Sequence, residues 1–138
     1  MMKPVKFDIK KDLAPIPFDD NVCQLALKMK ESGLVWHPHV GCFAWDPNSV
    51  ITSESPFPNR VYFVLSLPRF VDILGSVGEI SEKLVWLPTW HQARLLCQAM
   101  DITDDQEALP GSDLRCLPGE DITRIYRRII DRLEATKS

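Results

Sequence analysis

The chain has 138 residues, of which 45% are hydrophobic and 25% are charged, as is usual for a folded globular domain. Its 16 Lys and Arg against 19 Asp and Glu give a net charge of −3, which disfavours nucleic acids and anionic membrane surfaces as partners. The sequence has no apolar run of the roughly 18–20 residues that a membrane-spanning helix needs, and no apolar block follows its N-terminal lysines. We therefore expect no membrane segment, no secretory signal and a cytoplasmic location.

Residues 1–18 are predicted to form an extended N-terminal arm, and residues 19–138 a single α+β domain. Within the arm, Val5, Phe7 and Ile9 alternate with polar residues, which is typical of a short edge strand. After the arm, acidic capping residues and helical spacing predict a helix over 20–32 that ends at Gly33.

Four segments are predicted to be extended: 34–45, 50–52, 60–67 and 84–87. The strongest strand signal is 60–67, RVYFVLSL, which carries apolar and β-branched residues on both faces. Such a pattern is typical of a central strand that is covered on both sides. We therefore expect residues 60–67 to form the middle of the sheet.

Helical periodicity follows Pro68 as far as Gly75, returns briefly over 79–83, and resumes after Thr89, which is placed to cap the next helix. A long amphipathic helix is predicted over 119–138. Together these elements predict an α+β fold in which a small mixed or antiparallel sheet of three to four strands packs with three to four helices. The strand order is left open.

The four cysteines, Cys23, Cys42, Cys97 and Cys116, are widely spaced and form no CxxC pair. This excludes the usual zinc-ribbon and thioredoxin-like motifs, and in a reducing compartment it indicates thiols rather than disulfides. Cys23 and Cys97 fall on apolar helical stripes, so we expect them to be small core residues.

The histidines offer a candidate metal site. On a regular strand His37 and His39 would share one face, and His91 would add a third imidazole, a set that suits zinc or a similar divalent ion. The alternative function is therefore a small metal-binding protein or metal-dependent enzyme. Exposed polar histidines are the preferred interpretation, because such spacing alone is a weak predictor of a metal.

A nucleophile–base pair is a second catalytic hypothesis, with Cys42 or Cys97 as the thiol and His39 or His91 as the base. No motif surrounds either cysteine. On a regular strand Cys42 would also point away from His39. No catalytic residue is therefore assigned.

Two surface features bear on partners. Trp36, Trp45 and Trp90 are candidates for a groove or an interface, where tryptophan is enriched, although a tryptophan-rich core is the preferred interpretation. The last predicted helix carries a ridge of arginines that acidic residues interrupt, which favours a solvated, salt-bridged face over nucleic-acid binding. The ridge consists of Arg124, Arg127, Arg128 and Arg132.

The segment 83–92, KLVWLPTWHQ, resembles an "LVWLPT…Q" segment of small uncharacterised bacterial and phage-associated proteins. The resemblance implies a bacterial or mobile-element origin and no activity. Without a catalytic signature or a cofactor motif, the predicted function is a non-enzymatic domain that binds another protein or a second copy of itself as a homodimer.

Overall fold

The computed structural model describes residues 12, 16–55, 57–102 and 120–137. The helices are α1 (Asp20–Glu31), α2 (Leu67–Leu74), α3 (Val77–Lys83), α4 (Trp90–Ala99) and α5 (Glu120–Lys137), and a short 3-10 turn spans Pro58–Arg60. The strands are β1 (Phe43–Trp45), β2 (Val61–Phe63) and β3 (Val85–Leu87). The predicted alternation over Val5–Ile9 and the fourth cysteine, Cys116, lie outside the described residues.

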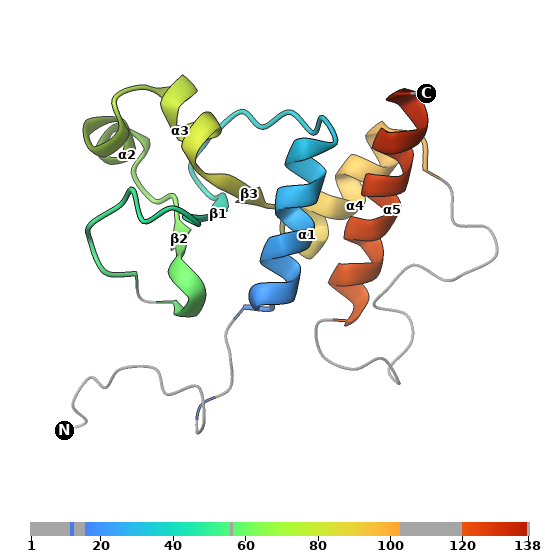
Figure 1. Cartoon of the computed structure of the whole chain (residues 1–138), viewed down its shortest axis with the longest axis horizontal. Coiled ribbons are helices and arrows are strands. Elements are labelled where there is room, and N and C mark those ends of the chain that lie inside the picture. The colour runs from blue at the N-terminus through green and yellow to red at the C-terminus, as the bar shows by residue number, and fades with distance from the viewer. Residues whose placement is uncertain (1–11, 13–15, 56, 103–119, 138) are drawn as a thin grey trace.

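The fold is a small antiparallel sheet between two layers of helices, with α2 and α3 on one side and α1, α4 and α5 on the other (Figure 1). The strand order is β2-β1-β3. Because side chains alternate along a strand, Trp45 joins the core formed with α1, α4 and α5, whereas Ala44 joins the core formed with α2 and α3. The α+β prediction is confirmed, with three strands and five helices in the described chain.

The predicted central strand lies elsewhere in the sheet. Only Val61–Phe63 of the segment 60–67 is strand, and β2 lies at an edge while β1 lies at the centre. The prediction that this segment is covered on both faces holds only in part: Val61 packs in one core and Val64 in the other, whereas Phe63 and Leu65 are exposed. A short sheet with helices on both faces makes even its edge strand apolar on both sides, and this pattern imitates a central strand.

The other extended predictions are too long. Of the segment 34–45 only β1 is strand, because the chain turns before it: Gly41 has a φ of +101°, and the Cys42 N–H donates to the His39 carbonyl. The segment 50–52 forms no strand, since the Val50 and Ile51 N–H groups donate to the Asp46 carboxylate instead of to a neighbouring strand.

The helices follow the predictions closely. The Asp19 carboxylate accepts from the Val22 N–H at the start of α1, and Gly33 adopts a φ of +111° just beyond its end. Cys23 and Cys97 are buried thiols, as expected. Within the residues that the structure describes, none of the helices has the length and apolar character required to cross a bilayer.

Candidate binding sites at the two sheet edges

The structure does not assemble the predicted metal site. His37 and His39 lie exposed on the segment between α1 and β1, and His91 is exposed on α4. Among the described residues, which include all three histidines, no three His, Cys, Asp or Glu side chains lie close enough to hold a metal ion. The prediction fails because residues 37–39 are not strand, so the imidazoles do not share a strand face.

Cys42 and His39 are nevertheless in contact, contrary to the expectation that they would point apart. The Cys42 Sγ lies 3.4 Å from both ring nitrogens of His39, whose Nδ1 is also 3.0 Å from the His37 carbonyl oxygen. The turn at Gly41 brings the two side chains together. The Cys42 side chain is completely buried, so a substrate could not reach its sulfur, and the pair carries no nucleophilic site.

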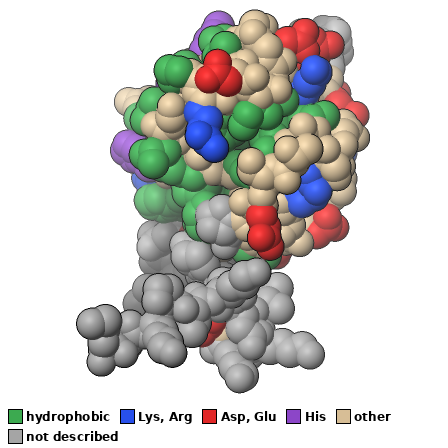
Figure 2. All heavy atoms as spheres, turned by 90° about the vertical axis from the view of Figure 1, so that its left-hand side faces the viewer, with side chains coloured by type: hydrophobic (Ala, Val, Ile, Leu, Met, Phe, Trp, Pro, Cys, Tyr) green, Lys and Arg blue, Asp and Glu red, His purple; other side chains and the backbone are tan. Residues whose placement is uncertain are grey.

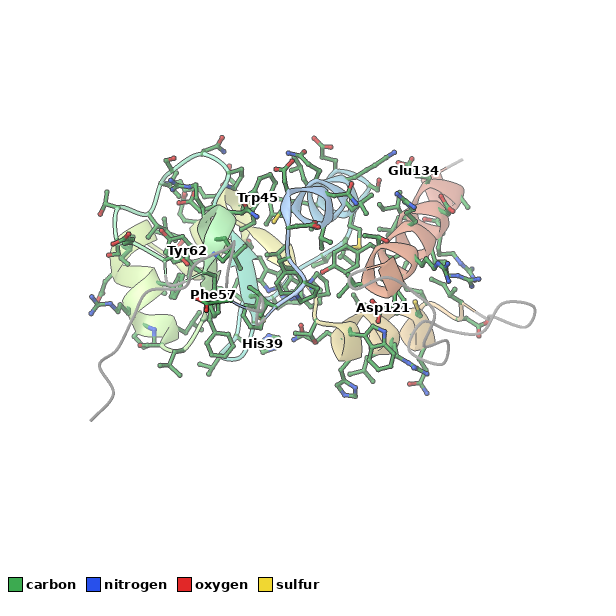
Figure 3. The ribbon with its side chains drawn as sticks, turned by 90° about the horizontal axis from the view of Figure 1, so that it is seen from below. His39, Trp45, Phe57, Tyr62, Asp121 and Glu134 are labelled. Atoms are coloured by element: carbon green, nitrogen blue, oxygen red, sulfur yellow. The ribbon has the colours of Figure 1, made fainter. Side chains whose placement is uncertain are left out.

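The three candidate tryptophans have different surroundings. Trp45 is a core residue beside α1 (Figure 3), which agrees with the tryptophan-rich core that the sequence favours over an interface. Trp90, at the start of α4, is half-buried beneath the Arg94 guanidinium, which lies 4.6 Å from the ring centroid. Trp36 packs against Trp86 of β3, and these two rings line a pocket at the β3 edge of the sheet.

Side chains from two helices cover the outer edge of β3. The Lys30 ammonium of α1 donates to the Leu84 carbonyl over 3.0 Å, and the Tyr126 hydroxyl of α5 donates to the Pro88 carbonyl. Sheet edges left uncovered are templates for pairing with another chain. These two hydrogen bonds therefore satisfy the outward carbonyls just before and just after β3.

The outer edge of β2 is less well protected. The Val64 N–H donates to the Cys42 carbonyl and the Asp46 N–H donates to the Arg60 carbonyl, so the even-numbered residues direct their backbone groups toward β1. Because the backbone N–H and C=O groups of successive residues point to opposite sides of a strand, those of Val61 and Phe63 point outward, away from β1.

Of the outward groups, the Val61 carbonyl accepts from the Ser55 hydroxyl. The Phe63 carbonyl accepts from the Leu65 N–H over 3.1 Å in a tight turn. Among the described residues none accepts from the Phe63 N–H. The Phe63 N–H is therefore a hydrogen-bond donor that remains available at the outer edge of β2.

An apolar groove of about 260 Å³ runs along this edge, between the loop 51–54, β2 and α2, and we call it the β2 groove. Phe63, Leu65 and Ile73 line it and are 38%, 75% and 40% exposed. Figure 2 views the molecule from this side and shows hydrophobic side chains gathered between scattered charged ones. Tyr62, which also lines the groove, lies with Phe57 on the β2 side of the molecule in Figure 3.

Sequence reasoning missed the β2 groove because it assigned the whole segment 60–67 to the core. One signal was present. Residues 61–65 have no charged residue and no proline, which are the usual means of protecting an exposed edge. An apolar edge strand without these features is a template for pairing with another chain.

Comparison with known proteins finds no family model, no curated protein and no solved structure that matches this chain. The segment 83–92 forms β3, the proline corner and the capped start of α4.

Proposed function

We propose that the chain is a protein-interaction domain that pairs through the β2 groove with a second copy of itself. The observation that carries the proposal is the combination, on one edge, of an outward Phe63 N–H and the exposed side chains of Phe63, Leu65 and Ile73. Added strands bind through backbone hydrogen bonds and gain specificity from pockets for alternate side chains. The β2 edge offers both.

A second copy fits this edge through its symmetry. Two antiparallel edge strands related by a two-fold axis form a self-complementary pair. A two-fold axis at Phe63 would set each Phe63 N–H against the Phe63 carbonyl of the second copy. It would also place both Leu65 side chains in the interface between the two copies. Apolar area now exposed to water would then be buried, which favours association.

The charges around the β2 groove support self-pairing. Glu54 and Arg69 both line the groove, so one surface carries both signs. In a two-fold pair a surface with both signs can be complementary to itself, whereas a groove of one sign would repel its copy.

Size is also compatible with a dimer. A standard interface covers about 800 Å² on each partner. The surface of this chain is 9149 Å², so such an interface would take about a tenth of it. A cytoplasmic location and a bacterial origin belong to the proposal as well, and they rest on the sequence alone.

Leu65→Lys tests the proposal, because it places a charge in the expected interface, two residues from the axis at Phe63, on a side chain that is already 75% exposed. By sedimentation velocity across micromolar to millimolar protein, we expect the wild type to dimerise and the variant to weaken dimerisation by about tenfold or more. Leu95→Lys, on the exposed face of α4, is the matched control and should dimerise like the wild type.

A wild-type protein that stays monomeric over the whole concentration range would overturn the proposal. Equal weakening by the Leu65 and Leu95 substitutions would overturn the assignment to β2. Circular dichroism melting of each variant checks that the fold is kept.

A further inference from the structure

A second hollow lies at the opposite edge of the sheet, beside β3, and we call it the indole pocket. Its volume is about 310 Å³, at the lower end of the roughly 300–1,000 Å³ typical of small-molecule sites. Its walls come from α1, α3, β3 and the segment 34–36, and all of its lining residues are described. It is separate from the β2 groove, because the two are lined by different residues at different edges.

Two tryptophans form the aromatic wall of the indole pocket. The Trp36 and Trp86 rings are nearly parallel, with an interplanar angle of 7° and centroids 6.5 Å apart. Trp36 is only 9% exposed, so its ring is held in place by packing. Flat, rigid indole surfaces bind planar apolar molecules by stacking and by burial of area.

Both indole N–H groups are buried, and no hydrogen-bond acceptor reaches either of them in the described chain. An indole N–H is only a donor, and leaving it buried and unsatisfied is unfavourable. The Trp90 N–H is also unsatisfied but does not line the pocket, and it provides an internal reference.

Lys30 supplies positive charge to the same pocket. Its ammonium donates to the Glu82 and Leu84 carbonyls, and its third proton has no partner among the described residues. Burial lowers the Lys30 pKa and the nearby Glu82 opposes that shift, which marks an ammonium that has lost part of its water shell. The other polar lining side chain is the Ser81 hydroxyl, and no carboxylate lines the pocket.

We propose that the indole pocket binds a small planar aromatic carboxylate, with its ring against Trp36 and Trp86 and its carboxylate at the Lys30 ammonium. The donor left available in the pocket is the third proton of the Lys30 ammonium, which matches an anionic, acceptor-only group such as a carboxylate. The mixed lining matches a ligand that is apolar at one end and anionic at the other. This site adds a small-molecule ligand to a chain whose proposed partner surface lies elsewhere.

The test uses 2-naphthoate as the probe and the four tryptophan indole N–H resonances of ¹⁵N-labelled full-length protein as the readout. The resonances are assigned with single Trp→Phe variants. We expect saturable shifts of the Trp36 and Trp86 resonances, while those of Trp45 and Trp90 stay in place. The uncharged 2-naphthylmethanol and the non-aromatic cyclohexanecarboxylate should each bind more weakly, by about tenfold.

Lys30→Gln and Lys28→Gln form a matched pair on the same helix, because only Lys30 reaches the pocket. Lys30→Gln should weaken 2-naphthoate binding by about tenfold or more, and Lys28→Gln by less than about twofold. The absence of shifts at millimolar 2-naphthoate would overturn the proposal. So would equal shifts at all four indoles, or binding that both substitutions leave unchanged.

Discussion

Asp46 is a fully buried carboxylate that holds the turn after β1. Its Oδ1 accepts from the Val50 N–H over 3.0 Å, and its Oδ2 accepts from the Ile51 N–H over 2.8 Å and from the Arg60 guanidinium over 2.7 Å. The Arg60 Nε also donates to the Asp46 carbonyl over 2.8 Å. These bonds tie the loop that lines the β2 groove to the start of β2.

Replacement of Asp46 by Asn should lower the free energy of unfolding by about 3 kcal/mol, since a buried, charged hydrogen-bonding group is lost. The amide cannot keep all three hydrogen bonds, and it removes the charge of a fully buried carboxylate that pairs with the partly exposed Arg60 guanidinium. Urea denaturation measures this loss. Asp72→Asn, at an exposed position on α2, should change stability by less than about 0.5 kcal/mol. Equal stability of the two variants would contradict the structural role of Asp46.

Single residues were predictable where their partners are close in sequence. The capping role of Thr89 and the helix-ending Gly33 were both read from neighbouring residues. The burial of Asp46 was not, because its ionic partner Arg60 is 14 residues further along the chain. The contact between Cys42 and His39 was missed for a local reason: the positive φ at Gly41 breaks the strand alternation that was assumed.

At the scale of elements, α4 begins with a reciprocal cap. The Thr89 hydroxyl accepts from the Gln92 N–H over 3.1 Å, and the Gln92 side chain accepts from the Thr89 N–H over 2.9 Å. Such capping boxes satisfy two amide groups that a helix start leaves without partners.

Replacement of Thr89 by Ala should destabilise the protein by about 1 kcal/mol, because the Gln92 N–H loses its acceptor. Thr89→Ser keeps the hydroxyl and should cost only a few tenths of that amount. Thermal and urea denaturation compare the two. If Ser were as damaging as Ala, the loss would come from packing of the Thr89 methyl group and not from the cap.

The helices were predicted better than the strands, and the reason lies in their length. A helix of 12 residues such as α1 shows several repeats of its apolar stripe, with capping residues at both ends. Each strand has three residues, too few to show an alternation. The position of β2 at the edge depends on which strands pair, and that information is absent from the segment 60–67 itself.

At the scale of the whole molecule, the packing of α1 against α5 closes the larger core. The Cys23 thiol of α1 and the Tyr126 phenol of α5 are both buried there. The Ser32 hydroxyl, just after α1, donates to the Glu134 carboxylate near the end of α5 over 2.7 Å. The sequence predicted an apolar face on α1 and another on α5, but it did not predict that these two faces pack against each other.

This interface predicts a loss of stability in alkali. Burial, together with the Asp20 and Asp19 carboxylates, raises the pKa of Cys23 to about 12, and burial next to Cys23 raises the pKa of Tyr126 well above its usual value. An unfolded thiol releases its proton near a pH of about 8.5 and an unfolded phenol near about 10. The unfolded state therefore loses protons first, and the free energy of unfolding falls as the pH rises through this range.

Urea denaturation at several pH values between about 7 and about 11 measures the fall. Cys23→Ala combined with Tyr126→Phe should flatten the alkaline slope while lowering stability at neutral pH, since the Pro88 carbonyl loses the Tyr126 hydroxyl. Lys30 acts in the opposite direction, because its lowered pKa means that the folded ammonium gives up its proton first. A double variant with the wild-type slope would show that other groups, such as Tyr62 with its raised pKa, control alkaline unfolding.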